Sequence, residues 1–254
     1  VFEKEARMGG VVRNVIPGFR ISDSAIDNDV KLVAAMGVEM VNGREITDIE
    51  ELKKDYDYVV LAVGASEQGI LKLETGDTMN ALDFLARFKA TDGKVELGKN
   101  VVVIGGGNTA MDTARAAKRN AGVEKVSLVY RRTRRYMPAD EEELVMAVED
   151  GVEFAELLAP VKLENGVLYC KRMVLGDIDA SGRRGVVETD QVVEVPADTV
   201  IAAVGEKVPG AFYENCGIVL DSRRRPQVNQ ETLETSVKDV YVAGDGLYGP
   251  ATVV

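Results

Sequence analysis

The sequence predicts an α/β fold built from repeated strand, turn and helix units, and two observations support this prediction. Short apolar runs suited to buried strands, such as residues 58–63, 101–104 and 198–204, alternate with amphipathic stretches suited to helices. A glycine follows each of these three runs at once, as it does at the carboxyl ends of strands in doubly wound folds. At 254 residues the chain can form two such domains.

Periodicity and turn residues predict the other elements. Apolar residues recur at helical spacing in residues 24–36 and 78–88, and Pro138 suits the first turn of a further helix. The acidic run 140–143 fits that helix N-terminus better than a metal site. The further predicted strands are residues 38–41, 126–130, 152–155, 167–175, 186–195 and 240–243. Residues 167–175 and 186–195 are expected to pair antiparallel around a polar loop at 179–184.

The stretch from Asn100 to Arg132 is the most informative part of the chain. It reads NVVVIGGGNTAMDTARAAKRNAGVEKVSLVYRR, an order of strand, glycine turn, helix and strand. This Rossmann-like unit places a pyrophosphate on a helix N-terminus. The turn has the spacing G-x-G-x-x-A, and the residues expected to contact a dinucleotide are Gly105, Gly106, Gly107, Asn108, Thr109 and Ala110.

Small residues have separate expected roles in this turn. Gly105 would permit the tight turn, Gly107 would let the backbone approach a phosphate, and Ala110 would let the helix pack on the strand. The spacing alone is a weak signal, so a glycine-rich turn without any ligand stays open as the alternative.

Arginines follow the second strand, where many dinucleotide sites have an acidic residue. A site for NAD usually has Asp or Glu about 20 residues past the glycines, to bind the ribose 2′-hydroxyl. This chain has Arg131 and Arg132 there, with Arg134 and Arg135 close behind. A guanidinium is always charged and can bond a phosphate with two donors, so the sequence predicts an NADP(H) site with Arg131 and Arg132 on the 2′-phosphate. A solvated basic turn is the alternative.

Five residues near other strand ends are further candidates for cofactor binding: Glu3, Gly64, Gly205, Gly244 and Asp245. An aspartate held between glycines at a strand end, as Asp245 is, can meet ribityl or pyrophosphate oxygens. The opening VFE looks like the end of a strand whose beginning is missing, and Glu3 would then bind a ribose hydroxyl. An exposed terminal glutamate is an equally good interpretation of Glu3.

Composition excludes several classes of function. The net charge of −11 disfavours general binding to nucleic acid or to anionic membranes. No apolar run approaches the roughly 20 residues that span a bilayer, and the charged opening VFEKEARMGG is not a signal peptide. We therefore expect no nucleic-acid partner, no membrane span and a cytoplasmic protein.

Histidine is absent and cysteine is scarce. The absence of histidine excludes Ser-His-Asp and Cys-His catalysis and zinc sites built on imidazole, whereas hydride transfer between two cofactors needs no protein imidazole. Cys170 and Cys216 form neither a CxxC pair nor a metal-spaced cluster, which favours a reducing compartment. Cys170 is expected to be a packed small residue, because no base is available to activate it. The sequence thus predicts no catalytic side chain and no metal site.

Five segments occur along the chain in one order: FEKEARMGG, VVLAVGA, VVVIGGGNTAMDTAR with VYRR and MPA behind it, DTVIAAVG, and VYVAGDG. This order resembles the two-dinucleotide-binding flavoprotein reductases. More narrowly, it is similar to the NADPH-dependent FAD/iron–sulfur oxidoreductases of the glutamate synthase small-subunit type, to the corresponding part of dihydropyrimidine dehydrogenase, and to selenate reductase iron–sulfur subunits. The segments GGGNTAMD and VYRRTRRYMPA are specific to that branch, and the ending GDGLYGPATVV is most similar to the selenate reductase type. The resemblance covers nearly all of the chain.

The resemblance implies an NADP(H)-binding domain, residues 77–206, inserted into an incomplete FAD-binding domain, residues 1–76 and 207–254. It implies that NADPH gives hydride to FAD and that electrons leave through iron–sulfur clusters in missing segments or in partner domains or subunits of a parent enzyme. Glu3, Gly64 and Asp245 would then serve FAD.

Several family features are missing from the sequence, namely the first FAD glycine loop, the cluster cysteines and the closing helix. We therefore expect a fragment that binds FAD weakly or not at all and is inactive alone. The CxxC pair of the disulfide-reducing relatives is also missing, which leaves that activity without support. Two other hypotheses are a flavin-free NADP-binding dehydrogenase and a nucleotide-binding or docking module without redox turnover.

Overall fold

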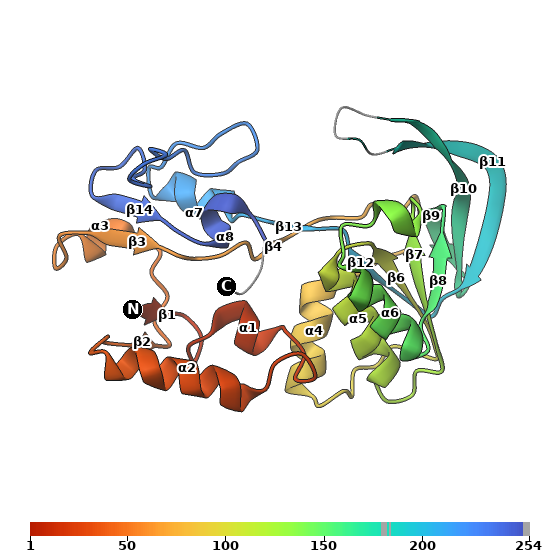
Figure 1. Ribbon diagram of the computed structural model, residues 1–254, viewed down its shortest axis with the longest axis horizontal. Coiled ribbons are helices and arrows are strands. Elements are labelled where there is room, and N and C mark those ends of the chain that lie inside the picture. Colours follow the sequence, from red (N-terminus) through yellow and green to blue (C-terminus); the bar gives the residue numbers. More distant parts are fainter. Residues whose placement is uncertain (179–181, 183, 251–254) are drawn as a thin grey trace. The chain divides into compact units, whose positions relative to one another are not determined.

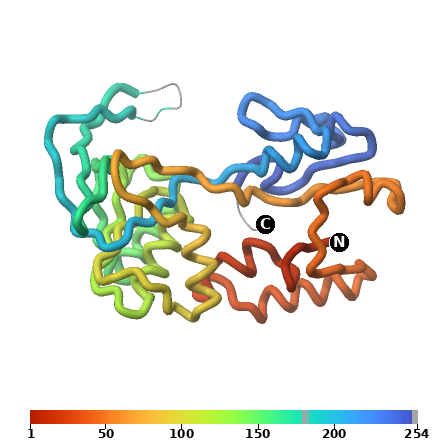
Figure 2. Tube along the Cα trace, turned by 180° about the vertical axis from the view of Figure 1, so that it is seen from behind, coloured from red at the N-terminus to blue at the C-terminus, as the bar shows by residue number. Residues whose placement is uncertain are grey.

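The computed structural model describes residues 1–178, 182 and 184–250, which fold as two compact units (Figure 1). The first unit contains Val1–Arg13, Ser22–Gln68 and the chain from Glu206 onward, and the second unit contains Asn14–Ile21 and Gly69–Gly205. β4 (Glu67–Gln68) and β13 (Glu206–Lys207) run antiparallel, side by side, where the chain leaves the first unit and returns to it (Figure 2).

A five-stranded sheet forms the centre of the second unit, in the order β5-β12-β6-β7-β8 with all neighbours parallel. Its strands are β5 (Met79–Asn80), β6 (Asn100–Gly105), β7 (Lys125–Tyr130), β8 (Glu153–Glu156) and β12 (Thr199–Ala203). The helices α4 (Ala81–Ala90), α5 (Asn108–Arg119) and α6 (Glu141–Glu149) lie on one side of this sheet (Figure 1). The predicted α/β pattern is confirmed in this unit.

An antiparallel sheet covers the other side of the parallel sheet. It has the order β11-β10-β9, with β9 (Leu158–Glu164), β10 (Val167–Ile178) and β11 (Arg184–Pro196). The predicted hairpin is confirmed as β10 and β11; in its loop, residues 179–181 and 183 lie outside the described residues. β9 was not predicted, although Asn165 and Gly166, both at positive φ, form the Asn-Gly turn typical of a tight hairpin.

Strand β6 shows how the sequence builds these layers. Because side chains alternate along a strand, Val101 and Val103 enter the core beneath the helices, whereas Val102 and Ile104 enter the core beneath the antiparallel sheet. All four side chains are buried. A strand that is covered on both faces needs apolar residues at every position, whereas a strand with one exposed face alternates apolar and polar residues.

The described part of the first unit has three two-stranded sheets and a core of its own. β1 (Phe2–Glu3) pairs in parallel with β2 (Val41–Asn42), and β3 (Val59–Leu61) with β14 (Val240–Val242). Its helices are α1 (Gly10–Asn14, which ends at the unit boundary), α2 (Asp23–Ala35), α3 (Ile49–Leu52), α7 (Gly210–Asn215) and α8 (Asp245–Tyr248).

Several element boundaries differ from the predictions, and three of the differences have a clear position in the structure. The strand expected at 38–41 is confined to Val41–Asn42. The helix expected from 78 begins at Ala81, because Met79–Asn80 pair with β12 and the Asn80 side chain caps the helix. Pro138 lies before a helix that begins at Glu141 rather than in its first turn. Within the described residues, no helix is long and apolar enough to cross a membrane.

Candidate functional site

The glycine turn Gly105–Gly107 joins β6 to α5 at the carboxyl edge of the parallel sheet. None of these three described glycines has a positive φ. A Cβ atom on Gly105 would lie 2.5 Å from the carbonyl oxygen of Ala203 and 2.8 Å from the Cβ of Ala110. Close packing, rather than the backbone conformation of a tight turn, therefore requires glycine at 105. Ala110 is fully buried, as its predicted packing role needs.

Gly107 is different, because a Cβ atom there would meet nothing within 4 Å. It is the N-cap of α5, and no described side chain caps this helix, whereas Ser22 caps α2 and Asn80 caps α4. An α-helix N-terminus carries partial positive charge and unpaired amides, and an anion can satisfy both. The open space at Gly107 therefore fits a phosphate group.

The arginine loop, residues 131–140, leaves β7 and returns to the glycine turn. The Ala139 amide donates to the Gly106 carbonyl at 3.0 Å. The Asp140 amide donates to Oδ1 of Asn108 at 3.0 Å, and Nδ2 of Asn108 donates back to Asp140 Oδ2 at 3.1 Å. Asn108 thus uses its side chain to hold the loop, which is a structural role that the spacing of the glycines did not indicate.

The four arginines of this loop have different surroundings. Arg134 binds Glu141 at 2.8 Å, and Nε of the half-buried Arg132 donates to the Arg184 carbonyl at 3.3 Å. Arg131 and Arg135 are exposed, and their side chains have no hydrogen bond or ion pair among the described residues. The two free guanidiniums are therefore those of Arg131 and Arg135, and Arg132 is already partly engaged.

Two further candidates lie along the same edge of the parallel sheet. Gly205 follows β12, whose Ala203 pairs with Gly105. It has a φ of 105°, and its carbonyl accepts from the Gly69 amide at 2.7 Å. Thr109 is half-buried in the first turn of α5, and its carbonyl accepts from the Thr113 hydroxyl at 2.6 Å. The structure thus brings together the glycine turn, the arginines and Gly205.

In the first unit, Gly64 and Asp245 come together because β3 and β14 are parallel neighbours. Gly244, between β14 and α8, has φ 66° and ψ −150°, a conformation open essentially to glycine alone. Glu3 lies elsewhere, at the end of β1, where its Oε1 accepts from the Glu5 amide at 3.0 Å.

Sequence reasoning did not single out Gly246, which lies beside the buried Tyr213. A Cβ atom on Gly246 would be 2.5 Å from the Tyr213 hydroxyl oxygen, and that oxygen has no hydrogen-bond partner among the described residues. Burial raises the pKa of Tyr213 to about 12. The spacing Gly244, Gly246, Gly249 repeats the G-x-G-x-x-G pattern and could have indicated this position.

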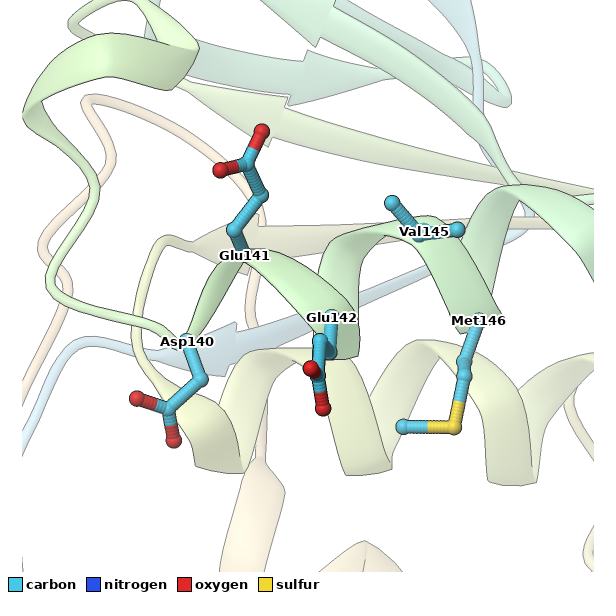
Figure 3. A pocket seen from close by; sticks show the side chains of 5 residues that line it. All are labelled: Asp140, Glu141, Glu142, Val145 and Met146. Atoms are coloured by element: carbon cyan, nitrogen blue, oxygen red, sulfur yellow. The ribbon is translucent and has the colours of Figure 1, made fainter.

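A depression of about 840 Å³ runs along the outer side of α6 (Figure 3). Its lining residues are Asp140, Glu141, Glu142, Val145 and Met146. Asp140 and Glu142 point in one direction, and Glu141, which pairs with Arg134, points in another (Figure 3). The carboxylates would repel a phosphate, so this depression does not hold the nucleotide phosphates.

Cys170 and Cys216 are both free and buried. Burial raises the pKa of the Cys170 thiol to about 12 and also raises the pKa of Cys216. A thiolate is the reactive form of cysteine, so neither side chain is poised as a nucleophile. Among the described residues, no group of His, Cys, Asp and Glu side chains is arranged to hold a metal ion.

The chain is similar to known proteins in sequence and in fold. A family model described as pyridine nucleotide-disulphide oxidoreductase matches residues 4–254. The protein YgfK of Escherichia coli K12, named as an oxidoreductase, is 43% identical over 100% of this chain and 25% of its own length. The glutamate synthase [NADPH] small chain of Azospirillum brasilense is 34% identical over 100% of this chain and 58% of its own length. The expected resemblance to glutamate synthase small chains is thus confirmed, and the chain spans less than two thirds of either relative.

A solved structure shows the same fold. FprA of Mycobacterium tuberculosis in complex with NADPH superimposes with a TM-score of 0.78 at 19% identity, over 99% of this chain and 72% of FprA. The predicted fold class, that of the two-dinucleotide-binding flavoproteins, is confirmed.

Proposed function

We propose, since this chain belongs to the pyridine nucleotide-disulphide oxidoreductase family, that it is the NADPH- and FAD-binding portion of a multi-domain oxidoreductase. The observation that carries the proposal is the uncapped N-terminus of α5 at Gly107, at the same edge of the parallel sheet as the arginine loop with Arg131 and Arg135. An uncapped helix end suits a pyrophosphate, and a guanidinium suits the 2′-phosphate that distinguishes NADPH from NADH.

Within this proposal each unit has its own nucleotide. Residues 77–206 hold NADPH, and residues 1–76 and 207–254 supply part of an FAD site. The glycine turn receives the pyrophosphate, and Arg131, with Arg132 or Arg135, receives the 2′-phosphate. Gly64, Gly244 and Asp245 are the residues of the first unit that we assign to FAD. Glu3 is assigned to a ribose hydroxyl.

The chemistry when both nucleotides are bound is hydride transfer from NADPH to FAD, followed by release of electrons to an acceptor. The chain's own residues bind and orient the nucleotides, and none is assigned an acid–base role. The lack of histidine in the sequence agrees with the absence of an acid–base role for the chain's residues.

The electron acceptor is proposed to be an iron–sulfur domain or subunit. Support comes from the motifs shared with the glutamate synthase type and from the Azospirillum relative, whose name describes it as a small chain. Reduction of a disulfide is not proposed, because both cysteines are buried and carry raised pKa values. Free, buried cysteines also suit a reducing compartment such as the cytoplasm.

The test uses the complete gene product, purified with its flavin and kept free of oxygen. We expect NADPH to bleach the flavin absorbance near its visible maximum, and NADH to do so far more slowly at equal concentration. NADPH binding without bleaching would instead support a docking module without redox turnover. Equal action of NADH and NADPH would contradict the assignment of the arginines.

A further inference from the structure

We propose that Glu156 is a positioning residue for nucleotide choice, because its carboxylate fixes the part of the arginine loop that carries Arg131 and Arg135. This inference rests on the proposed function, since it concerns how the same site selects a 2′-phosphate. Glu156 is the last residue of β8 and pairs with Tyr130, the last residue of β7. It therefore stands at the point where the arginine loop begins.

Two hydrogen bonds join the end of β8 to this loop. Oε2 of Glu156 accepts from the backbone amide of Arg134 at 2.9 Å. The amide of the next residue, Leu157, donates to the carbonyl of Arg132 at 3.2 Å. The turn between Arg132 and Arg134 is thus held from one side by an acceptor and a donor on neighbouring residues.

Leu157 holds an uncommon backbone conformation at this point, with a φ of 58°. This left-handed region is costly for leucine and persists where surrounding contacts fix it. The fixing contact is on β10, because the Met173 amide donates to the Leu157 carbonyl at 2.8 Å. The antiparallel sheet therefore supports the end of β8, and through it the arginine loop.

The arginine side chains of the anchored loop differ in whether they have a further partner. Arg134 is fixed further by Glu141, whereas Arg131 and Arg135 have no side-chain partner among the described residues. A fixed backbone limits the positions that a free guanidinium can take, so less entropy is lost when it binds a phosphate. The loop can thus keep its arginines available without leaving them wholly disordered.

Glu156 has an opposing effect through its charge. Its exposed carboxylate, near the site for a dianionic phosphate, repels that phosphate. Positioning and repulsion act in opposite directions on NADPH affinity. They can be separated, because glutamine keeps an acceptor oxygen without the charge, and alanine removes both.

The experiment measures the Kd values of NADPH and NADH by calorimetry for the wild-type chain, Glu156→Gln and Glu156→Ala. For Glu156→Ala we expect a loss of about tenfold in NADPH affinity and an unchanged NADH affinity, because one charge-assisted hydrogen bond is lost. Glu156→Gln is expected to keep the preference for NADPH. The matched control is Glu153→Ala at the other end of β8, where the side chain pairs with Lys125 at 2.9 Å, and we expect no change in preference.

Three results would overturn the inference. The first is tighter NADPH binding by both Glu156 variants, which would leave charge repulsion as the only role of this residue. The second is an unchanged ratio of the two Kd values in Glu156→Ala. The third is an equal loss of NADH and NADPH affinity, which would indicate general damage. A wild-type chain without preference for NADPH contradicts the proposed function as well. An unchanged ratio of the two Kd values in Glu156→Ala, together with weaker NADPH binding in Arg131→Ala, contradicts this inference alone.

Discussion

The ring of Tyr130 lies so close to Gly106 that a Cβ atom on this glycine would be 2.4 Å from ring carbon Cε2. The hydroxyl of the same tyrosine donates to the carbonyl of Tyr136 at 2.9 Å. One side chain therefore joins the glycine turn to the arginine loop. The two parts of the proposed NADPH site are built as one structure, and substitutions in the turn can separate stability from binding.

Gly106→Ala is expected to destabilise the fold. The added methyl group meets the Tyr130 ring in a packed core, and such overpacking costs roughly 1–3 kcal/mol. Urea unfolding followed by circular dichroism would measure this loss. A free energy of unfolding equal to that of the wild type would show that the Tyr130 ring can move away, and it would contradict a tight contact between this ring and Gly106.

Gly107→Ala is expected to affect NADPH binding more than the stability of the fold. The new methyl group enters open space, and the φ of −97° and ψ of 175° suit alanine, so the only expected loss of stability is the usual cost of alanine at a helix N-cap, about 1 kcal/mol. The methyl group fills the space assigned to a phosphate, so NADPH affinity should fall by about tenfold or more. Calorimetry with NADPH measures this, and unchanged affinity would place the phosphate elsewhere.

The sequence predicted β6 and β12 of the parallel sheet well, because each has an apolar run with a glycine behind it. It also predicted β7 and β8, which have no glycine behind them, but it placed Met79–Asn80 of β5 in a helix. It did not predict β9, which contains Pro160. Proline removes a backbone donor and normally argues against a strand, but β9 is the edge of its sheet and its register shifts where Cys170 faces Pro160. The position of β9 at the edge of the sheet thus permits a proline that, in the sequence alone, argues against a strand.

The arginine loop shows what the sequence could and could not provide at the site. The sequence alone does not distinguish Arg131 from Arg132, whereas in the structure Arg132 is half-buried and its side chain contacts Arg184, which is distant in sequence. Likewise, the support from Glu156 depends on β7 and β8 lying side by side. Pairings between distant segments have no signature in a single sequence.

Stability should rise on moderate acidification through Asp112. Burial, opposed by the nearby Arg20 and reinforced by Glu143, raises the pKa of this carboxyl from 3.8 to about 6. The folded protein therefore binds a proton more tightly than the unfolded chain. The resulting stabilisation is complete below pH 4 and is lost as the pH rises through 6, with an upper limit of about 3 kcal/mol.

Asp112→Asn is the variant that tests this linkage. Free energies of unfolding measured from pH 5 to pH 8 should fall with pH more steeply in the wild type than in the variant. Parallel curves for the two proteins would show that Asp112 titrates near its ordinary pKa.

The cysteines are expected to be unreactive in the folded protein. Cys170 is fully buried with a pKa of about 12, and Cys216 is also buried, so Ellman's reagent at pH 8 should label neither until the chain is denatured. Rapid labelling of either thiol under native conditions would contradict the structure. It would also make disulfide reduction by this chain a hypothesis to test.

The proposed NADPH site is tested most directly by the Kd values of NADPH and NADH for the wild type, Arg131→Ala and Arg134→Ala. Arg134 is the matched control, because Glu141 already holds its guanidinium at 2.8 Å. We predict that Arg131→Ala weakens NADPH binding by about tenfold or more and leaves NADH binding unchanged, with little effect of Arg134→Ala on either. Equal binding of NADPH and NADH by the wild type, with no effect of Arg131→Ala, would contradict the proposal.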